Sequence, residues 1–244
     1  MQPQPLQDAR VLITGGGRGI GAAAARLFAA QGANVMIASR TLDQLEQVAE
    51  SANSALGQQH IFTHAADISQ PDDVEALFLQ VKQRMGRLDV LVNNAGAICL
   101  EAFEQMPLDR WEQMMNINLR GPFLCGQAAF ALMKENHNGG SIINISSLAG
   151  IRGAEKFAGT SAYVSSKMAL IGLTEVMSVE GKPYGIRVNA IAPGAVDTQM
   201  LRDALPHLQT QTRPEDIAPS ILYLADPKQS GPVTGTVLEI HCNA

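Results

Sequence analysis

Tyr163 and Lys167 stand four residues apart in a segment, 162–179, whose apolar residues recur at helical spacing. A spacing of four places both side chains on one face of a helix. A free tyrosine, with a pKa of about 10, is a poor acid or base at neutral pH, but a nearby ammonium favours the phenolate. The pair could then exchange a proton with a carbonyl or alcohol oxygen. Alternatively, the two are an ordinary aromatic residue and a lysine whose stem covers apolar surface.

Other polar residues stand where they could assist such a reaction. The apolar run Ser141–Ile145 ends in Ser146 and Ser147, and a hydroxyl there could bind a substrate oxygen or cap the next turn. Asn118 lies inside a long predicted helix, Leu108–Lys134. Because asparagine is a mediocre helix former, this interior position indicates a functional role, a bond to a backbone carbonyl, or exposure to solvent.

A glycine-rich turn joins the first apolar run to an alanine-rich predicted helix. Glycine permits a tight turn and lets the backbone approach a pyrophosphate, and the helix start offers free N–H groups and a positive dipole end. This placement predicts a dinucleotide site, although a glycine-rich run alone could be only a tight turn. No Lys-Ser/Thr pair follows, so the loop is not of the triphosphate-binding kind. The expected cofactor contacts here are Gly15, Gly17, Arg18, Gly19, Ile20 and Gly21.

The residues after the second and third predicted strands indicate which dinucleotide binds. NAD-specific sites place an Asp or Glu near the end of the second strand, on the ribose 2′-hydroxyl. Here the chain has Ser39 and Arg40, with Arg18 as a second cation. A guanidinium can donate two parallel hydrogen bonds to a phosphate, so we predict NADP(H), the alternative being a solvated arginine at a helix start. Asp67 could contact the adenine or cap the helix beginning near Pro71.

All these residues follow short apolar runs that alternate with longer amphipathic segments. Runs that are apolar throughout are typical of strands covered on both faces, so the sequence predicts an α/β, Rossmann-like, doubly wound parallel sheet of about seven strands. No linker interrupts the chain, and we expect one NADP-binding domain over residues 1–244. The predicted strands are Arg10–Thr14, Asn34–Ala38, His60–Ala65, Leu88–Val92, Ser141–Ile145, Ile186–Ile191 and Thr236–Ile240. The predicted helices are Gly19–Gln31, Leu42–Ala55, Asp72–Met85, Leu108–Lys134, Ala162–Val179 and Pro214–Leu224, with loops over Leu148–Thr160 and Gly194–Thr212.

Four motifs together resemble those of the short-chain dehydrogenase/reductase family, over essentially the whole chain. They are Thr14-Gly15-xxx-Gly19-x-Gly21, Asn93-Asn94-Ala95-Gly96, Tyr163-xxx-Lys167, and Pro193-Gly194 followed by Thr198. Each is modest alone, but a chance match in this order and spacing is very improbable. Within the family the sequence is most similar to the 3-oxoacyl (acyl-carrier-protein) reductase-type members.

The resemblance implies roles for individual residues. Tyr163 would be the general acid in carbonyl reduction and the base in alcohol oxidation, while Lys167 would lower its pKa and bind the nicotinamide ribose. Ser147, rather than Ser146, would hold the substrate oxygen, and Asn118 would support a water that links Lys167 to bulk solvent. Besides Tyr163 and Lys167, further cofactor contacts would come from Ser39, Arg40, Asp67, Ile68, Asn94, Ala95, Gly96, Pro193, Gly194, Val196 and Thr198.

Two loops depart from the family pattern. The loop between Ser147 and Tyr163 is longer than usual, and the segment from Thr198 to Arg213 is shorter than the usual substrate lid. A short lid implies an open or unusual substrate pocket.

The composition excludes several other classes of protein. A chain that is 46% hydrophobic and 17% charged does not stay disordered. Its net charge of −5 includes no basic block, so we expect no nucleic-acid partner. The three separated cysteines form no metal-ligand spacing and suit a reducing compartment. The N-terminus lacks a signal peptide and no apolar stretch approaches a membrane span, so we expect a cytoplasmic protein without metal or membrane contact.

Two predicted helices, Leu108–Lys134 and Ala162–Val179, carry apolar residues on more than one face and need cover beyond their own sheet. In the family these helices pair with their copies in a neighbouring subunit, so we expect a homotetramer or homodimer.

The expected activity is NADPH-dependent reduction of a small-molecule carbonyl, a 3-oxoacyl thioester or similar ketone, to a secondary alcohol. In this reaction the cofactor carries the hydride and Tyr163 the proton. One alternative is an NAD(P)-dependent dehydrogenase that oxidises a secondary alcohol or sugar. A remote alternative is a regulatory protein that binds NADP without turnover.

Overall fold

The computed structural model describes residues 6–135 and 139–242, and within these ranges seven strands form one sheet. Neighbouring strands are parallel throughout, in the order β3-β2-β1-β4-β5-β6-β7. The chain builds outward from β1 in one direction and then from β4 in the other, so the predicted doubly wound, Rossmann-like sheet is confirmed. The strands are β1 (Arg10–Thr14), β2 (Asn34–Ser39), β3 (Ile61–Ala65), β4 (Val90–Asn93), β5 (Gly140–Ile145), β6 (Ile186–Pro193) and β7 (Val237–Ile240).

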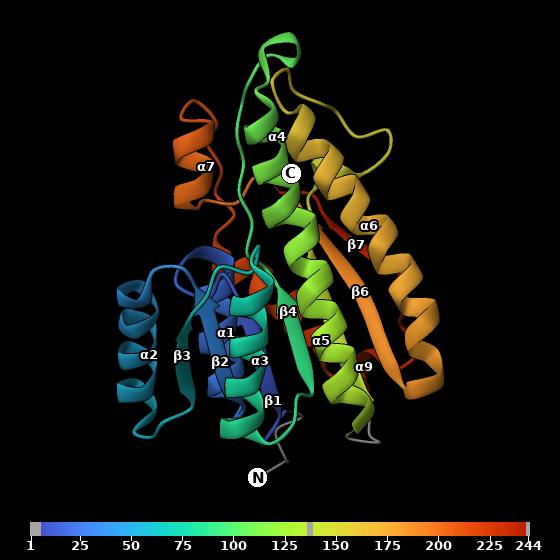
Figure 1. The fold of residues 1–244 in the computed structure, drawn as a ribbon. Helices are drawn as coiled ribbons and strands as arrows, with labels where there is room; N and C mark the ends of the chain where they lie inside the picture. Colours follow the sequence, from blue (N-terminus) through green and yellow to red (C-terminus); the bar gives the residue numbers. More distant parts are fainter. Residues whose placement is uncertain (1–5, 136–138, 243–244) are drawn as a thin grey trace.

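Helices cover both faces of this sheet (Figure 1). One buried cluster joins the sheet to α1, α2 and α8, and the other joins it to α3, α5 and α6. The helices are α1 (Gly19–Ala30), α2 (Leu42–Leu56), α3 (Pro71–Met85), α4 (Leu108–Met115), α5 (Gly121–Glu135), α6 (Ser161–Gly181), α7 (Gln199–Ala204), α8 (Pro214–Ala225) and α9 (Pro227–Ser230). Short 3₁₀ turns lie at Phe103–Gln105, Leu148–Gly150 and Lys182–Tyr184.

The two-sided cover explains why the strands are apolar throughout. Successive side chains of a strand point to opposite faces of the sheet. In β1, Leu12 belongs to the cluster beneath α3 and α5, whereas Ile13 belongs to the cluster beneath α1 and α8. Leu91 and Val92 divide in the same way in β4, and all four side chains are fully buried. An alternating polar residue would therefore lie inside a core on either face.

The long predicted helix Leu108–Lys134 is not one regular α-helix. Helices α4 and α5 follow one another along a single rod in Figure 1, but the five residues Asn116–Arg120 between them form a π turn. The prediction of an uninterrupted α-helix was wrong at this point, because apolar periodicity continues across the wider turn. Asn118 lies within the π turn and is fully buried. Single π turns inside helices occur frequently at functional sites.

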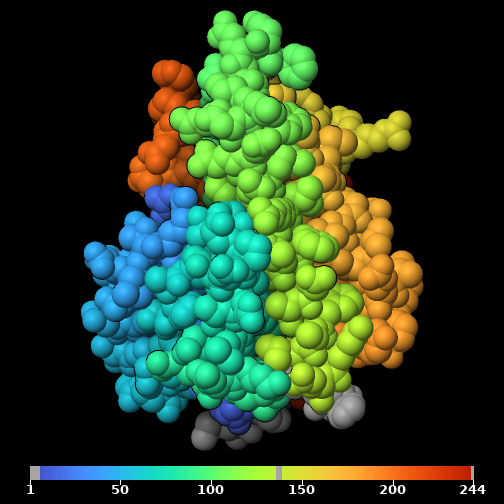
Figure 2. Space-filling view, viewed as in Figure 1, coloured from blue at the N-terminus to red at the C-terminus, as the bar shows by residue number. Residues whose placement is uncertain are grey.

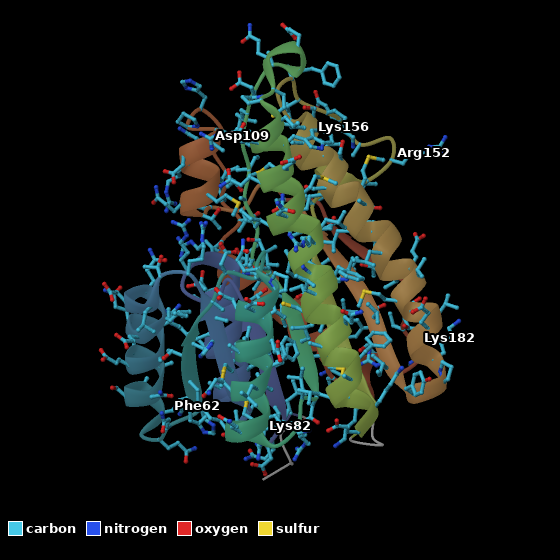
Figure 3. All side chains as sticks on the ribbon, viewed as in Figure 1. Phe62, Lys82, Asp109, Arg152, Lys156 and Lys182 are labelled. Carbon is cyan, nitrogen blue, oxygen red and sulfur yellow. The ribbon has the colours of Figure 1, made fainter. Side chains whose placement is uncertain are left out.

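The carboxyl edge of the sheet carries the segments that were expected to build a ligand site. The segment Gly194–Thr212, predicted as a loop, contains the six-residue helix α7, so that part of the prediction was wrong. In the space-filling view the region around α4 rises above this edge, with the chain around α7 on one side and the loop at 150–157 projecting on the other (Figure 2). Arg152 lies at the outer end of that loop, pointing away from the body of the protein (Figure 3).

Candidate active site

A cleft runs along the carboxyl edge of the sheet, from the ends of β2 and β3, past the glycine loop, to the ends of β5 and β6. With two exceptions, every residue that the sequence analysis assigned to catalysis or cofactor binding lines this cleft. The exceptions are Gly21 and Asn118, which lie behind its wall. Residues that are far apart in the chain, such as Arg18, Asp67 and Tyr163, are thus brought to one continuous surface.

Gly15 and Gly21 show why the loop requires glycine. Gly15 adopts a left-handed backbone, with φ of +68°, and a Cβ there would lie 2.8 Å from Ala95 Cα. A Cβ at Gly21 would lie 2.4 Å from the carbonyl oxygen of Gly15, closer than non-bonded atoms approach. Gly21 therefore lets the first turn of α1 pack against the loop, rather than contacting a ligand itself. The resulting bare backbone at a helix N-terminus fits the pyrophosphate of a dinucleotide.

Asn94 and Thr14 fasten the glycine loop to the end of β4. The Asn94 amide donates hydrogen bonds of 3.0 Å to the carbonyl oxygens of both Thr14 and Gly15. In return, the Thr14 hydroxyl accepts from the backbone N–H groups of Asn94, at 3.1 Å, and Ala95, at 3.2 Å. The side chain of Asn94 is thus engaged in holding the loop, while its residue still lines the cleft.

At one end of the cleft two arginines stand near the loop. The Arg18 and Arg40 side chains are exposed, and in the part of the chain that the structure describes neither forms an ion pair with a carboxylate. Ser39 and Gln44 approach the loop from the same side: a Cβ at Gly17 would lie 3.4 Å from Ser39 Oγ and 3.1 Å from Gln44 Cβ. Nothing in the sequence singled out Gln44, because its proximity to Gly17 depends on how α2 packs.

Asp67 does not cap α3. The residue before α3 is Gln70, whose side chain makes no capping bond, so the alternative reading of Asp67 as a helix cap was wrong. Its carboxylate instead accepts hydrogen bonds from the backbone N–H and hydroxyl of Ser69, at 3.0 and 2.8 Å. The Asp67 backbone N–H donates to Asp73. These bonds fix the turn after β3 so that Asp67 and Ile68 line the cleft.

At the other end of the cleft, the structure separates the roles of the two adjacent serines. Ser146 is buried, and its hydroxyl donates a 3.0 Å bond to the carbonyl oxygen of Lys167. The Ser147 hydroxyl accepts from the N–H of Ala149 at 3.1 Å and is hydrogen-bonded to Tyr163. Of the two hydroxyls, only that of Ser147 is therefore beside the Tyr163 phenol. Contact between Ser147 and a substrate oxygen stays a prediction.

Burial raises the pKa of Tyr163 above its ordinary value, and the hydrogen bond with Ser147 acts in the opposite direction with a smaller effect. The expected lowering of this pKa by Lys167 was wrong for this structure. The Lys167 ammonium lies 5.9 Å from the centre of the Tyr163 ring and donates a 2.8 Å bond to the carbonyl oxygen of Ile145. The phenol thus keeps its proton at neutral pH, as a general acid requires.

Lys167 is itself strongly perturbed. Its side chain is buried, and this burial lowers its pKa from 10.5 to about 8, because desolvation disfavours the ammonium form. A buried lysine without a carboxylate partner is costly to fold around. Such a group at the wall of a cleft is a candidate for function rather than stability.

Asn118 acts on the wall of the cleft from behind. Its side-chain oxygen accepts from the N–H of Ala97 at 2.8 Å, and its amide donates to the carbonyl oxygen of Ala97 at 2.9 Å and to Ser166 at 3.0 Å. Ala97 lines the cleft next to Gly96. Asn118 therefore fixes both backbone groups of a cleft residue. Nothing in the sequence indicated Ala97 or Ser166.

Over residues 6–135 and 139–242, no group of three or more His, Cys, Asp or Glu side chains could hold a metal ion. No helix in these ranges is both long enough and apolar enough to span a membrane. Burial raises the pKa of Cys125 to about 12, and desolvation also raises that of Cys99, so both thiols stay protonated at neutral pH.

A doubly wound parallel sheet, a glycine loop before α1 and a Ser-Tyr-Lys group at the same edge define a nucleotide-dependent oxidoreductase. Comparison with known proteins identifies the family: the model for the short chain dehydrogenases matches residues 9–209. The chain therefore belongs to the short-chain dehydrogenase/reductase family, whose members use NAD(P)(H) and act on CH–OH or carbonyl groups. The expectation of an enzyme of this class is confirmed.

Three relatives show the range of reactions around this chain. It is 35% identical over 246 residues to the 3-oxoacyl-(acyl-carrier-protein) reductase of Thermotoga maritima, covering 96% of this chain and 97% of that protein. It is 38% identical to the trans-4-hydroxycyclohexanecarboxylate dehydrogenase of Sinomonas cyclohexanicum, covering 94% and 90%. Among solved structures, levodione reductase matches with a TM-score of 0.89 and 32% identity, covering 96% of each chain.

Replacement of the buried lysine should stabilise the protein. Lys167→Met removes a desolvated ammonium, so we expect the free energy of unfolding of the cofactor-free protein to rise by about 1–3 kcal/mol at pH 7 while activity is lost. The difference in the free energy of unfolding between Lys167→Met and the wild type should narrow between pH 8 and 10.5. In this range the folded wild type has lost the Lys167 proton while the unfolded chain still binds it, so the wild type becomes more stable as pH rises.

Urea denaturation at pH 7, 8 and 9 and fixed protein concentration measures this difference. Lys182→Met is the matched control, because Lys182 directly follows helix α6, is exposed, and extends away from the fold (Figure 3). A Lys167→Met protein that is less stable than the wild type at pH 7 would contradict the inference that burial of this ammonium destabilises the fold.

Proposed function

We propose that the protein is an NADPH-dependent reductase that converts a ketone, such as the carbonyl of a 3-oxoacyl thioester, to a secondary alcohol. The observation that carries the proposal is the grouping of Ser147, Tyr163 and Lys167 at one end of the cleft, with Arg18 and Arg40 at the other. When bound, the dinucleotide supplies the hydride. The chain itself must hold the ketone oxygen, provide one proton to it, and bind the cofactor close to the residues that do so.

Tyr163 is the proposed proton donor. Its raised pKa keeps the phenol protonated at neutral pH, so it can transfer a proton to the oxygen as the carbonyl carbon accepts hydride. Ser147, which is hydrogen-bonded to Tyr163, would hold the same oxygen from the other side. Lys167 would bind the ribose next to the nicotinamide, and Asn118 would support the water through which the proton is replaced.

The two arginines support NADP(H) over NAD(H). Both are free of carboxylate partners within the described residues, and the position after β2 holds Ser39 and Arg40 instead of an acidic side chain. A 2′-phosphate between Arg18 and Arg40 would receive charge-assisted hydrogen bonds. Because cells keep NADP largely reduced, this preference also supports the direction of carbonyl reduction.

The charged residues of the cleft wall support a substrate whose reacting part carries no charge. The charged residues that line the cleft, within the described ranges, are Arg18, Arg40, Asp67 and Lys167. The first three lie by the glycine loop and β3, and the Lys167 ammonium is bonded to Ile145. A carboxylate adjacent to the ketone would have no free cation to pair with, and an unpaired buried charge is strongly disfavoured. We therefore favour a ketone or thioester over a 2-oxo acid.

The lid segment around helix α7 is short, and its two flanks are hydrogen-bonded to each other. Helix α7 adds the apolar side chains of Met200 and Leu201 to the cleft. Its flanks are joined by hydrogen bonds from Asp197 N–H to the Thr212 carbonyl, at 2.8 Å, and from the Thr210 hydroxyl to the Ala195 carbonyl, at 2.9 Å. These bonds support a compact lid that leaves room for bulky carbonyl substrates.

A second candidate is the reverse reaction, the oxidation of a secondary alcohol. The similarity to an enzyme named for dehydrogenation of a hydroxycyclohexane carboxylate favours it. The same residues would serve, with Tyr163 as the base, but burial opposes the phenolate that this direction requires.

We further propose that the protein acts as a cytoplasmic homotetramer or homodimer of one domain spanning residues 1–244. The outer faces of α5 and α6 expose large apolar side chains: Phe123 is 46% exposed, Val176 56% and Val179 63%. A groove beside them, formed by α4, the π turn, α5 and α6, is lined by Met115, Leu119, Phe123 and Leu173 together with the polar Asn116 and Arg120. A second copy would cover this surface, and the unpaired cysteines suit a reducing compartment.

Removing the assigned acid tests the reaction. Tyr163→Phe keeps the ring but cannot donate a proton, so kcat for ketone reduction should fall by about 10²–10⁴-fold. The Kd for NADPH, measured by fluorescence titration, should change little because the fold of the cleft is kept. Tyr184→Phe, at an exposed tyrosine beside Lys134, should leave both values unchanged. A Tyr163→Phe enzyme that retains most of its turnover would remove Tyr163 from the mechanism.

Reversing one charge tests the cofactor. Arg40→Asp removes a charge-assisted hydrogen bond, so kcat/KM for NADPH should fall by roughly 10- to 150-fold relative to that for NADH, equivalent to about 1.5–3 kcal/mol. Arg84→Asp, an equal charge change at the exposed far end of α3, should leave the ratio unaltered. Steady-state kinetics with both cofactors measures it, and a wild type that prefers NADH would refute the proposed specificity.

Placing a charge on the outer face of α6 tests the assembly. Val176→Glu should shift the protein to a smaller oligomer, because a carboxylate would be buried at the contact without a partner. Leu79→Glu, on the exposed face of α3, introduces the same group at a comparable exposure and should not do so. Sedimentation velocity at several concentrations distinguishes them; identical profiles for Val176→Glu and wild type would exclude this face as the interface.

A further inference from the structure

We propose that Ser166 is a positioning residue of the active site, which links the turn bearing Tyr163 through Asn118 to Ala97, in the segment of the cleft that follows β4. The inference rests on the proposed role of Tyr163. Ser166 precedes Lys167 on α6 and is fully buried. It does not line the cleft, so any effect on the reaction must act through its neighbours.

The hydroxyl of Ser166 makes two hydrogen bonds of defined direction. It donates to the carbonyl oxygen of Tyr163 at 2.7 Å and accepts from the Asn118 amide at 3.0 Å. A serine hydroxyl has one proton, so its donation to Tyr163 leaves only acceptor capacity for Asn118. The nitrogen of the Asn118 amide must therefore face Ser166, which turns the amide oxygen toward the N–H of Ala97.

This orientation carries the link across the site. With its oxygen on Ala97 N–H and its second amide proton on Ala97 C=O, Asn118 saturates both backbone groups of that residue. The preceding residue, Gly96, is so close that a Cβ there would lie 3.3 Å from the Asn118 oxygen and 3.5 Å from the Lys167 ammonium. The series Tyr163–Ser166–Asn118–Ala97 thus joins α6, the π turn and the segment after β4.

Loss of the Ser166 hydroxyl should loosen this series at its centre. The Asn118 N–H would remain buried without a partner, which is costly, and the amide could rotate away from Ala97. The turn bearing Tyr163 and the wall formed by Ala97 would then no longer be held in register. Because reacting groups must meet within narrow distance limits, a small displacement reduces turnover more than ligand binding.

The same helix contains a matched control. The hydroxyl of Ser178 is also buried and makes the same type of bond, at 2.7 Å, to the carbonyl oxygen three residues before it, Glu175. Its hydrogen bond stays within α6, whereas that of Ser166 continues to Asn118. Ser178→Ala therefore reproduces the local loss of one back-bonded hydroxyl without breaking a connection to the site.

The experiment compares Ser166→Ala and Ser178→Ala in the complete enzyme. We expect kcat for ketone reduction to fall about 10-fold or more in Ser166→Ala, approaching the roughly 10²-fold that a displacement of about 1 Å can cause. KM and the Kd for NADPH should change far less than kcat. Ser178→Ala should match the change in melting temperature while keeping wild-type kcat. Ser166→Thr, which retains a hydroxyl that can bond back along the helix as Thr174 does, should recover most of the lost turnover.

A double-mutant cycle identifies the route of the effect. If Ser166 acts through Asn118, Ser166→Ala should reduce kcat little further in an Asn118→Ala background, whereas independent effects would multiply. Equal kcat values for Ser166→Ala and Ser178→Ala, or a multiplicative cycle, would overturn the inference. Tyr163→Phe in the same assay separates the two failures: if it is inactive the proposed function stands and only the role of Ser166 is lost, and if it is active both are overturned.

Discussion

The site depends on one constraint, the burial of a parallel sheet on both faces. Parallel strands require crossover connections, whose helices cover both faces of the sheet, and strands that run in one direction all end at the same edge. At that edge, backbone groups and polar side chains leave the core together. The residues after β1, β2, β3, β4, β5 and β6 therefore meet at one cleft, although they span the chain from Gly15 to Leu201. The common direction of the strands therefore decides where the catalytic and cofactor-binding residues can come together.

The loops at that edge are fastened to one another, because side chains that follow one strand bind the loop of another. Asn94, after β4, binds the backbone of Thr14 and Gly15, and Thr14 binds back to the β4 segment. Asn118 does the same for Ala97 from the π turn. Such reciprocal bonds preorganise the site, so that a ligand need not order the loops when it binds. An asparagine suits this task, since an amide can both donate to and accept from one backbone segment, as Asn118 does with Ala97.

The electrostatics of the site favour the uncharged forms of Tyr163 and Lys167, at the expense of the stability of the fold. Tyr163 and Lys167 are both desolvated, which raises the pKa of the phenol and lowers that of the ammonium. Each shift opposes the charged form, so the pair stays closer to neutral than either residue would in water. A phenol that keeps its proton is suited to acid catalysis, while a desolvated ammonium that donates to the Ile145 carbonyl rather than to a carboxylate, within the described residues, is a cost to the fold. Active sites commonly retain such costs because the reaction requires them.

The sequence by itself determined the features that depend on short-range pattern. Strand and helix positions, the glycine loop and the Tyr163–Lys167 pair followed from periodicity, turn chemistry and spacing, because each is set by residues within a few positions of one another. The family was indicated by the resemblance of four motifs to those of known members. The tertiary structure alone decided the rest. It interrupted the predicted helix with the π turn at Asn118, turned Asp67 to Ser69 instead of α3, placed Gln44 beside Gly17, and raised the pKa of Tyr163 where the Lys167 charge had been expected to lower it. These outcomes depend on burial and on distances between segments far apart in the chain, and neither quantity is a property of local sequence.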